Sequence, residues 1–282
     1  MIDFKANNDE ELVELENKIY YLKKGFRHPV WGISKALCVI KLKLKLIPLE
    51  LALAGNGGER LVIKDWQSAL QSNDFVTLAH IQRYLWVQPY LEGCVCLDAG
   101  CGIGYGTHHL SSSSHLATII GVDLSRDAIK YAQKKYKAKN LKFQQMNVAA
   151  LEFARESFDA VISFDVLEHL NEADQKKFFA EVVRVLKPNG TVYIGCPNGK
   201  KTALWHPNRF HLKELLQEEF ESLLKQYFQD VNLLGQDIVY KGVRQKEKIN
   251  SEVSNLSISN FIVAKNDYVF GLLSVCKKPF KL

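Results

Sequence analysis

The stretch VCLDAGCGIGYGT (95–107) decides the fold, because a short apolar run leads there into alternating glycines. Cys94–Asp98 is typical of a parallel strand buried on both faces, and a predicted helix follows the glycines. A loop between a strand and a helix is where an α/β sheet binds its ligand. Because glycine has no Cβ, the backbone of this loop can approach a ligand closely.

The spacing of the glycines disfavours two common nucleotide-binding loops. A dinucleotide fingerprint G-x-G-x-x-G would need glycine at 105 or 107, where the chain has Tyr105 and Thr107. The P-loop pattern G-x-x-x-x-G-K-[ST] does not occur. What remains is D-x-G-x-G-x-G, followed by a helix whose first amides can hold a carboxylate. Asp123 ends the next predicted strand, where a carboxylate accepts hydrogen bonds from a ribose diol.

A strand–helix alternation from residue 75 onward predicts an α/β fold with a doubly wound parallel sheet. The predicted strands are Cys94–Asp98, Thr118–Asp123, Leu141–Gln145, Ala160–Phe164, Thr191–Cys196, Val231–Leu234 and Tyr268–Cys276. The predicted helices are Phe75–Leu91, Arg126–Lys137, Gln175–Leu186 and Leu212–Tyr227. The polar stretch 244–260 predicts a surface loop. We therefore expect an N-terminal appendage over residues 1–74 and one domain over residues 75–282.

The expected appendage has three parts. Apolar residues from 9 to 26 recur at helical spacing and predict a helix packed on the core, while its two heptads leave a homodimer open. Within 35–54, Lys41, Lys43 and Lys45 alternate with leucines. A solvated edge is the favoured interpretation because lysines this close cannot lie in hydrocarbon, and a membrane-surface contact is the alternative. AGNGGER (54–60) predicts a hinge.

Composition bounds the class of protein. The 282 residues are 47% apolar and 24% charged, which excludes a disordered or collagen-like chain. The net charge of +6 permits an anionic partner, but the absence of dense basic runs disfavours nucleic acid. Six cysteines without a CxxC pair disfavour structural zinc and favour a reducing compartment. The acidic, polar start of the sequence is unlike a secretory signal, so we expect a cytoplasmic protein.

Five ordered motifs carry a resemblance to a known family. They are LDAGCGIGYG (97–106), GVDLS (121–125), QMNV (145–148), SFDAVISFDVLEHL (157–170) and VLKPNGTVYIGCPN (185–198). Together they resemble the class I S-adenosylmethionine (SAM)-dependent methyltransferases. The resemblance implies a seven-stranded Rossmann-like sheet with a reversed final hairpin, transferase activity, and SAM as the cofactor.

The resemblance also implies which residues bind SAM. The loop glycines would contact the methionine moiety and Asp123 the ribose, while Asn147, where an aspartate is common, would accept from the adenine amino group. The implied cofactor-binding positions are Arg83, Asp98, Gly100, Gly102, Gly104, Asp123, Leu124, Met146, Asn147, Val148 and Asp165.

A narrower resemblance lies on either side of these motifs. GERLVIKDW…HIQRYLW (58–86) and NRFHLKELLQEEF (208–220) resemble bacterial methyltransferases found with polysaccharide and glycan assembly enzymes. In such enzymes an arginine before the first strand binds the SAM carboxylate, and Arg83 matches that position. Alternatively, Arg83 only solvates its helix. His80 shares its helical face and is either structural or lines the pocket.

FDVLEHL (164–170) supplies the candidate catalytic groups. Methyl transfer from a sulfonium is an in-line displacement that also requires removal of a hydroxyl proton. Asp165, Glu168 and His169 stand at i, i+3 and i+4 and would converge on one side of a turn. With His211 or His206 they are a ligand set for Mg²⁺ or Mn²⁺. Similar motifs occur in metal-dependent O-methyltransferases, where the metal holds a vicinal diol.

The same groups also suit a metal-free site. Asp165 is shorter than the glutamate usual in the metal sites, which weakens the metal interpretation. In either case His169, His211 and Asp165 are the predicted catalytic residues, since neutral histidine is a natural base for a hydroxyl. Three aromatic residues would stack on a sugar or belong to the core, namely Tyr105, Trp205 and Phe210.

We therefore predict a SAM-dependent O-methyltransferase that acts on a hydroxyl of a glycan or activated sugar. An RNA ribose 2′-O-methyltransferase is an alternative, and it would show a basic stripe and a steep salt dependence of binding. A quinone or phenolic acceptor would require an apolar pocket. A non-catalytic SAM-binding module is the alternative outside enzymes, and the intact glycine loop and D-x-x-E-H cluster disfavour it.

Overall fold

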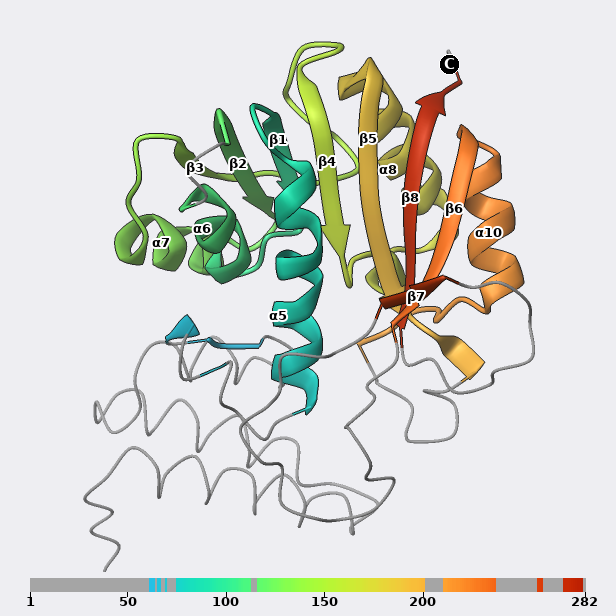
Figure 1. Ribbon diagram of the computed structural model, residues 1–282, viewed down its shortest axis with the longest axis horizontal. Helices are drawn as coiled ribbons and strands as arrows, with labels where there is room; N and C mark the ends of the chain where they lie inside the picture. The colour runs from blue at the N-terminus through green and yellow to red at the C-terminus, as the bar shows by residue number, and fades with distance from the viewer. Residues whose placement is uncertain are drawn as a thin grey trace, which may run out of the picture. The chain divides into compact units, whose positions relative to one another are not determined.

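The strand–helix alternation folds into one mixed sheet with helices on both faces (Figure 1). The computed structural model describes residues 61–63, 65, 66, 69, 75–112, 116–200, 210–236, 258–260 and 271–280. The predicted helix at 9–26, the segment 35–54 and the hinge at 54–60 lie outside these residues, so the division at residue 74 stays a prediction. Among the described helices, none has the length and apolar character needed to cross a lipid bilayer.

Five parallel strands form the half of the sheet that carries the glycine loop, in the order β3-β2-β1-β4-β5. Their bounds are β1 Val95–Ala99, β2 Thr118–Asp123, β3 Leu141–Gln145, β4 Phe158–Phe164 and β5 Leu186–Pro197. The predicted bounds of β2 and β3 are confirmed, whereas β4 and β5 begin earlier than predicted. Because the carboxyl ends of parallel strands meet at one edge, the residues that follow β1, β2, β3 and β4 gather there.

The other half of the sheet is antiparallel. β8 (Gly271–Pro279) lies between β5 and β6 (Phe228–Gln236), which confirms the reversed final hairpin. β7 (Ile258–Asn260) pairs with the end of β6 and adds an eighth strand at the edge. The prediction of a loop over 244–260 is therefore wrong for these last three residues, because three residues are too few to show an alternating pattern.

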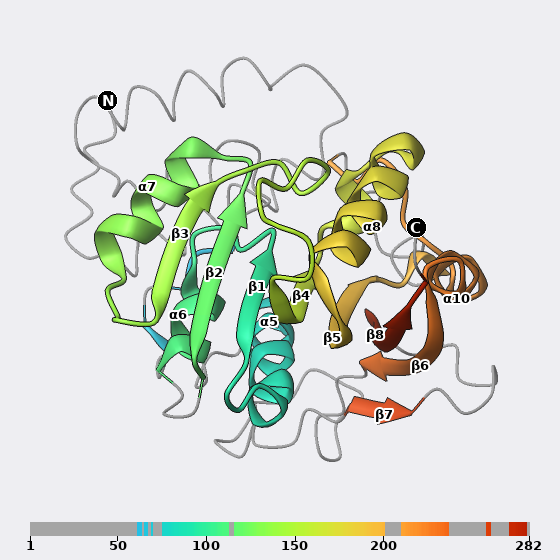
Figure 2. The ribbon, with the colours of Figure 1, turned by 90° about the horizontal axis from the view of Figure 1, so that it is seen from above.

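Helices cover both faces of the sheet, as Figure 2 shows from above. One face carries α5 (Phe75–Val87), η1 (Gln88–Tyr90), α6 (Tyr105–Ser111) and α7 (Arg126–Lys135), and the other carries α8 (Glu172–Val185) and α10 (Gln217–Lys225). Successive residues of β1 therefore enter different cores: Cys96 packs with α5 and α6, and Leu97 packs with α8. Burial on both faces explains why the parallel strands are continuous apolar runs.

Side-chain caps fix where two of these helices begin. The hydroxyl of Ser125 accepts from the Ala128 amide at 3.3 Å at the start of α7, directly after Asp123. The Asn171 side chain accepts from the Asp174 amide at 2.9 Å at the start of α8. Each cap satisfies a backbone donor that has no partner within the helix, so the loop before each helix has a defined end point.

Gly106→Ala tests the contact between α5 and α6. A Cβ at Gly106 would lie 2.1 Å from the ring of Tyr84, which also contacts the Phe164 ring edge-on at a centroid distance of 5.6 Å. Because the Tyr84 ring is buried between these groups, we expect the free energy of unfolding to fall by about 1–3 kcal/mol in urea denaturation. Val76→Ala, at a position of α5 that is 43% exposed, should change it by less than about 0.5 kcal/mol. Equal stability of the two variants would show that this contact is loose.

Candidate cofactor pocket and acceptor site

The glycine loop adopts a backbone that suits close ligand approach. Gly100, Gly102 and Gly104 have φ angles of +90°, +57° and +82°, a region that residues with a Cβ rarely adopt. A Cβ at Gly104 would lie 2.5 Å from the Phe143 ring, so the packed ring leaves no room for a side chain at this position. At Gly102 no heavy atom lies within 4 Å of a Cβ position, so the loop faces open space there. The loop is therefore packed on one side and accessible on the other.

Asp123 holds this loop in place. One carboxylate oxygen accepts from the Gly102 amide at 3.0 Å, and the other accepts from the Ser125 amide at 2.8 Å. The amides of Gly100 and Cys101 donate to the Val122 carbonyl at 2.8 and 2.9 Å. A carboxylate oxygen has a second lone pair, so Asp123 can still accept from ribose hydroxyls as predicted.

Asp98 lies in β1 just before the loop, and its side chain is buried at 1% exposure. Its Oδ2 accepts from the Thr107 hydroxyl at 2.6 Å and from the Tyr84 hydroxyl at 3.4 Å, and its Oδ1 has no hydrogen-bond partner among the described residues. Burial raises the pKa of this carboxyl to about 7, against the effect of the two hydroxyl donors. Asp98 therefore ties β1 to α6 and leaves one buried acceptor oxygen at the edge of the pocket.

The predicted adenine contacts follow β3. The Met146 amide donates to the Asp123 carbonyl at 3.0 Å, which joins the adenine and ribose positions. The Asn147 side-chain oxygen accepts from the Ala149 amide at 2.9 Å within a short turn. Leu124 is 68% exposed beside Asp123, and Val148 is buried. The predicted cofactor-binding positions Leu124, Met146, Asn147 and Val148 are thus at the carboxyl edge, and their contacts with the cofactor stay predictions.

Arg83 has two acceptors of its own inside the protein. Its side chain is 1% exposed, its Nε donates to the Gln236 side-chain oxygen at 2.7 Å, and its Nη1 pairs with the Asp165 carboxylate. A SAM carboxylate would have to share this guanidinium with Asp165. The predicted cofactor contact of Arg83 therefore stays a prediction, and the alternative that Arg83 only solvates its helix is wrong, because the side chain is buried.

Asp165 contacts two basic side chains of α5, those of Arg83 and His80. Its φ of +54° places it in the left-handed region directly after β4. Its Oδ2 also lies 3.3 Å from Nε2 of His80, whose Nδ1 is 3.1 Å from the Tyr105 hydroxyl. Burial raises the pKa of this carboxyl, but the Arg83 guanidinium and the His80 ring outweigh that effect and hold it below its ordinary value. Asp165 is thus a charged carboxylate with Oδ1 unbonded among the described residues.

The acceptor side forms at the next turn, η2 (Leu167–His169). Glu168, His169 and His211 offer ligand atoms that all lie within 4.8 Å of one another. The two imidazole rings meet edge to face, with centroids 5.0 Å apart. Glu168 is 1% exposed, so the carboxylate is at the base of this group. Three of the four predicted metal ligands are therefore together, whereas Asp165 pairs with Arg83 and His80 instead.

Backbone hydrogen bonds hold the two halves of this cluster together. The Leu212 and Lys213 amides donate to the Glu168 carbonyl at 2.7 and 3.3 Å. Nδ1 of His169 donates to the Phe210 carbonyl at 3.2 Å, since a carbonyl can only accept. Phe210 therefore contributes its backbone here, and the predicted Trp205 and His206 lie outside the described residues. Glu214, whose carboxylate pairs with Nδ1 of His211, was not predicted from the sequence.

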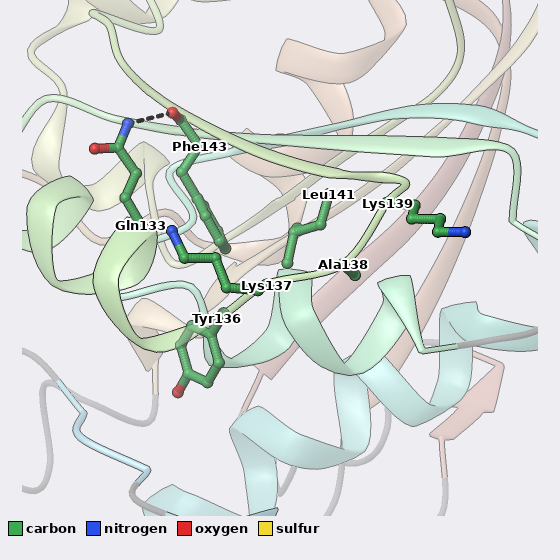
Figure 3. Close-up of a pocket in the computed structure, with 7 residues that line it drawn as sticks. All are labelled: Gln133, Tyr136, Lys137, Ala138, Lys139, Leu141 and Phe143. Atoms are coloured by element: carbon green, nitrogen blue, oxygen red, sulfur yellow. Dashed lines mark hydrogen bonds between the residues drawn. The ribbon is translucent and has the colours of Figure 1, made fainter.

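Two cavities lie away from this edge. Figure 3 shows one of about 420 Å³ between the end of α7 and the start of β3, lined by Gln133, Tyr136, Lys137, Ala138, Lys139, Leu141 and Phe143, with the Lys139 side chain directed away from the other residues. Leu141 begins β3, at the end of the strand opposite to the pocket edge. The other cavity, of about 870 Å³, includes Trp86, Tyr90 and Tyr193 and lies over β5, β8 and β6. Neither contains a predicted site residue.

Comparisons with known proteins define the class. Residues 97–194 match the family described as "Methyltransferase domain". A Mycobacterium tuberculosis (strain H37Rv) protein named "Probable S-adenosylmethionine-dependent methyltransferase" is 34% identical over 163 residues, or 55% of this chain and 56% of that protein. A phthiotriol/phenolphthiotriol dimycocerosates methyltransferase of Mycobacterium leprae is 32% identical over 158 residues, or 54% of this chain and 58% of that protein. A SAM-dependent methyltransferase structure from Archaeoglobus fulgidus has a TM-score of 0.52 and 18% identity, and covers 76% of this chain and 98% of that one.

Residues 97–194 therefore match a methyltransferase domain on a Rossmann-like fold, and the relatives named as SAM-dependent methyltransferases support SAM as the predicted cofactor. The matched range includes the glycine loop, Asp123, Glu168 and His169. This chain spans somewhat more than half the length of the two curated relatives. The association with glycan assembly stays a prediction.

Asp123→Ala tests the cofactor assignment. The substitution removes the carboxylate that holds Gly102 and faces the predicted ribose position, so we expect SAM affinity in calorimetry to fall at least 100-fold. Asp127→Ala, an exposed acidic residue in the first turn of α7, is the matched control and should bind SAM like the wild type. Retained affinity in Asp123→Ala would contradict the assignment.

Asp165→Ala tests the buried ion pair. The variant leaves the Arg83 guanidinium buried without its anion, so we expect a loss of about 3–5 kcal/mol in unfolding free energy. Because the pKa of Asp165 is lowered on folding, its contribution is present above the ordinary carboxyl pKa of about 3.9 and is lost as pH falls below it. Urea denaturation should therefore show a smaller acid-induced loss for Asp165→Asn than for the wild type. Parallel pH profiles would show that Asp165 is not charged in the folded protein.

Proposed function

We propose that this chain is a SAM-dependent O-methyltransferase that methylates a hydroxyl of a sugar, with a divalent cation bound by Glu168, His169 and His211. The observation that carries the proposal is the group of these three side chains, with ligand atoms within 4.8 Å, at the turn after β4. The same edge of the sheet carries the glycine loop and Asp123. A methyl donor at the loop and a hydroxyl at the cluster would therefore be neighbours.

The donor atoms of the cluster suit a cation such as Mg²⁺ or Mn²⁺. Nδ1 of His169 donates to a carbonyl and Nδ1 of His211 faces a carboxylate, which favours the proton on Nδ1 and the lone pair on Nε2 in both rings. The buried Glu168 carboxylate adds an anionic oxygen donor. A cation bound there would lower the pKa of a coordinated hydroxyl.

The chain's own residues have two tasks in this reaction. Where no cation occupies the cluster, His169 or His211 offers Nε2 as the acceptor for the hydroxyl proton, and the backbone bonds between η2 and residues 210–213 fix both rings before an acceptor arrives. Asp165 and Asp123 place carboxylates around the donor pocket, which suits the positive charge of a sulfonium. The homodimer predicted from residues 9–26 and the membrane-surface contact predicted for residues 35–54 stay predictions.

A hydroxylated apolar acceptor is the second candidate. Leu212 and Leu216, close in sequence to His211, are 65% and 44% exposed, so the acceptor side has apolar surface. The Mycobacterium leprae relative is named for phthiotriol and phenolphthiotriol dimycocerosates. Both candidates have a hydroxyl as the methyl acceptor, so the same site chemistry serves either one.

Titration of Mn²⁺ into chelator-treated protein saturated with S-adenosylhomocysteine tests the cation. We expect one site by calorimetry in the wild type and none in Glu168→Ala. Glu172→Ala, whose side chain is 80% exposed in the first turn of α8, is the matched control and should keep the site. If the wild type binds no Mn²⁺, the cation is contradicted and the two histidines act alone.

Transfer of labelled methyl from SAM to a panel of sugars, hydroxylated lipids and RNA tests the acceptor. We expect labelled sugar ethers, formed by the wild type and not by a His169→Ala variant that still binds SAM. Labelled lipid with unlabelled sugar would favour the second candidate, and labelled RNA alone would overturn both.

A further inference from the structure

The two histidines of the acceptor site are held by different kinds of acceptor. His169 donates from Nδ1 to a neutral backbone carbonyl, that of Phe210. His211 pairs through Nδ1 with the carboxylate of Glu214, three residues further along the chain. A carboxylate partner both orients an imidazole and increases the basicity of its other nitrogen. The two rings are therefore not equivalent.

We propose that Glu214 is a positioning residue, which keeps the proton of His211 on Nδ1 and leaves the lone pair of the ring on Nε2. This inference rests on the proposed function for what Nε2 does, but the tautomer itself is independent of any cation. Glu214 would act through His211 and not as a ligand, since the group of neighbouring ligand atoms consists of Glu168, His169 and His211.

Burial distinguishes this pair from an ordinary surface ion pair. The side chains of His211 and Glu214 are 12% and 15% exposed, whereas the pair of Lys177 with Asp174 is 64% and 37% exposed. Exposed pairs contribute little because water competes for both groups. A mostly buried carboxylate in contact with one imidazole nitrogen therefore constrains the tautomer of that ring.

The backbone around Glu214 is also fixed. The Gly199 amide donates to the Leu215 carbonyl at 3.0 Å, and a Cβ at Gly199 would lie 2.7 Å from the Glu214 carbonyl oxygen. Leu215 is 3% exposed and belongs to the core shared by α8 and α10. The Leu212 amide is bound to the Glu168 carbonyl on the other side of His211. The segment is thus anchored both before and after the His211–Glu214 pair.

Charge supports the same role. Glu168 and Glu214 contribute two formal negative charges, one directly to the cluster and one through the His211 ring. Two anions and two neutral imidazoles match the charge of a divalent cation and its preference for nitrogen and oxygen donors.

The tautomer can be measured without a cation or an acceptor. Protonated and unprotonated imidazole nitrogens have distinct shifts in ¹⁵N NMR spectra. The spectra of chelator-treated protein are recorded at a pH about two units above the ordinary histidine pKa of about 6.5. We expect His211 with Nδ1 protonated in the wild type and in Glu214→Gln, whose side-chain oxygen can still accept. We expect a tautomer mixture in Glu214→Ala. Unchanged His211 signals in Glu214→Ala would overturn the proposal.

Cation affinity gives the second measurement, by the Mn²⁺ titration described above. We expect the dissociation constant to rise about 10–100-fold in Glu214→Ala and less in Glu214→Gln, with unchanged S-adenosylhomocysteine affinity. Glu218→Gln, an exposed glutamate on α10, is the matched control and should behave like the wild type. Wild-type affinity in Glu214→Ala would contradict the positioning role. If the wild type binds no Mn²⁺, the cation is wrong, and the NMR result decides on Glu214 alone.

Discussion

The buried ion pair between Arg83 and Asp165 joins the parts of the chain on which the candidate site depends. Arg83 comes from α5, Asp165 follows β4, and the Gln236 side chain that accepts from Arg83 ends β6. The Gln236 amide donates in turn to the Ala79 carbonyl at 2.9 Å and to the Gln82 side chain at 3.0 Å. Burying a guanidinium costs several kcal/mol unless its donors are used, so this network defines one arrangement of α5, β4 and β6.

The position of the acceptor site follows from this arrangement. With the Asp165 side chain held toward α5, the chain leaves β4 through a left-handed residue and enters η2 directly. Glu168 and His169 then lie on the side of the turn that contacts residues 210–213. The carboxylate that pairs with Arg83 and the carboxylate beside the histidines are only three residues apart, yet they serve different sides of the pocket. The candidate cofactor position at Asp165 and the candidate acceptor position at Glu168 and His169 are thereby separated by one turn of the chain.

Local patterns in the sequence predicted most of the fold. The bounds of β2 and β3 and the position of the glycine loop followed from short apolar runs and turn residues, which are signals contained in a few neighbouring residues. Asp123 and the cluster of Glu168 and His169 were found in the same way. The features that were not predicted depend on contacts between residues far apart in the sequence. The Arg83–Gln236 hydrogen bond joins residues 153 positions apart, and β7 pairs with the edge of β6 at Leu234–Gln236. Asp165 was misplaced among the metal ligands because spacing alone does not show that α5 provides it with a guanidinium and an imidazole as partners.

The distribution of charge connects the two sides of the pocket. Asp98, Asp123 and Asp165 lie at or directly after the carboxyl ends of β1, β2 and β4, Glu168 lies in η2 after β4, and Arg83 pairs with Asp165. Carboxylates at this edge would favour a cationic methyl donor over the neutral thioether that remains after transfer, because the sulfonium charge disappears in the reaction. The Arg83–Asp165 pair limits this effect, since an unpaired Asp165 would add a full charge to the pocket. The Arg83–Asp165 pair therefore affects the charge of this edge as well as the stability of the fold.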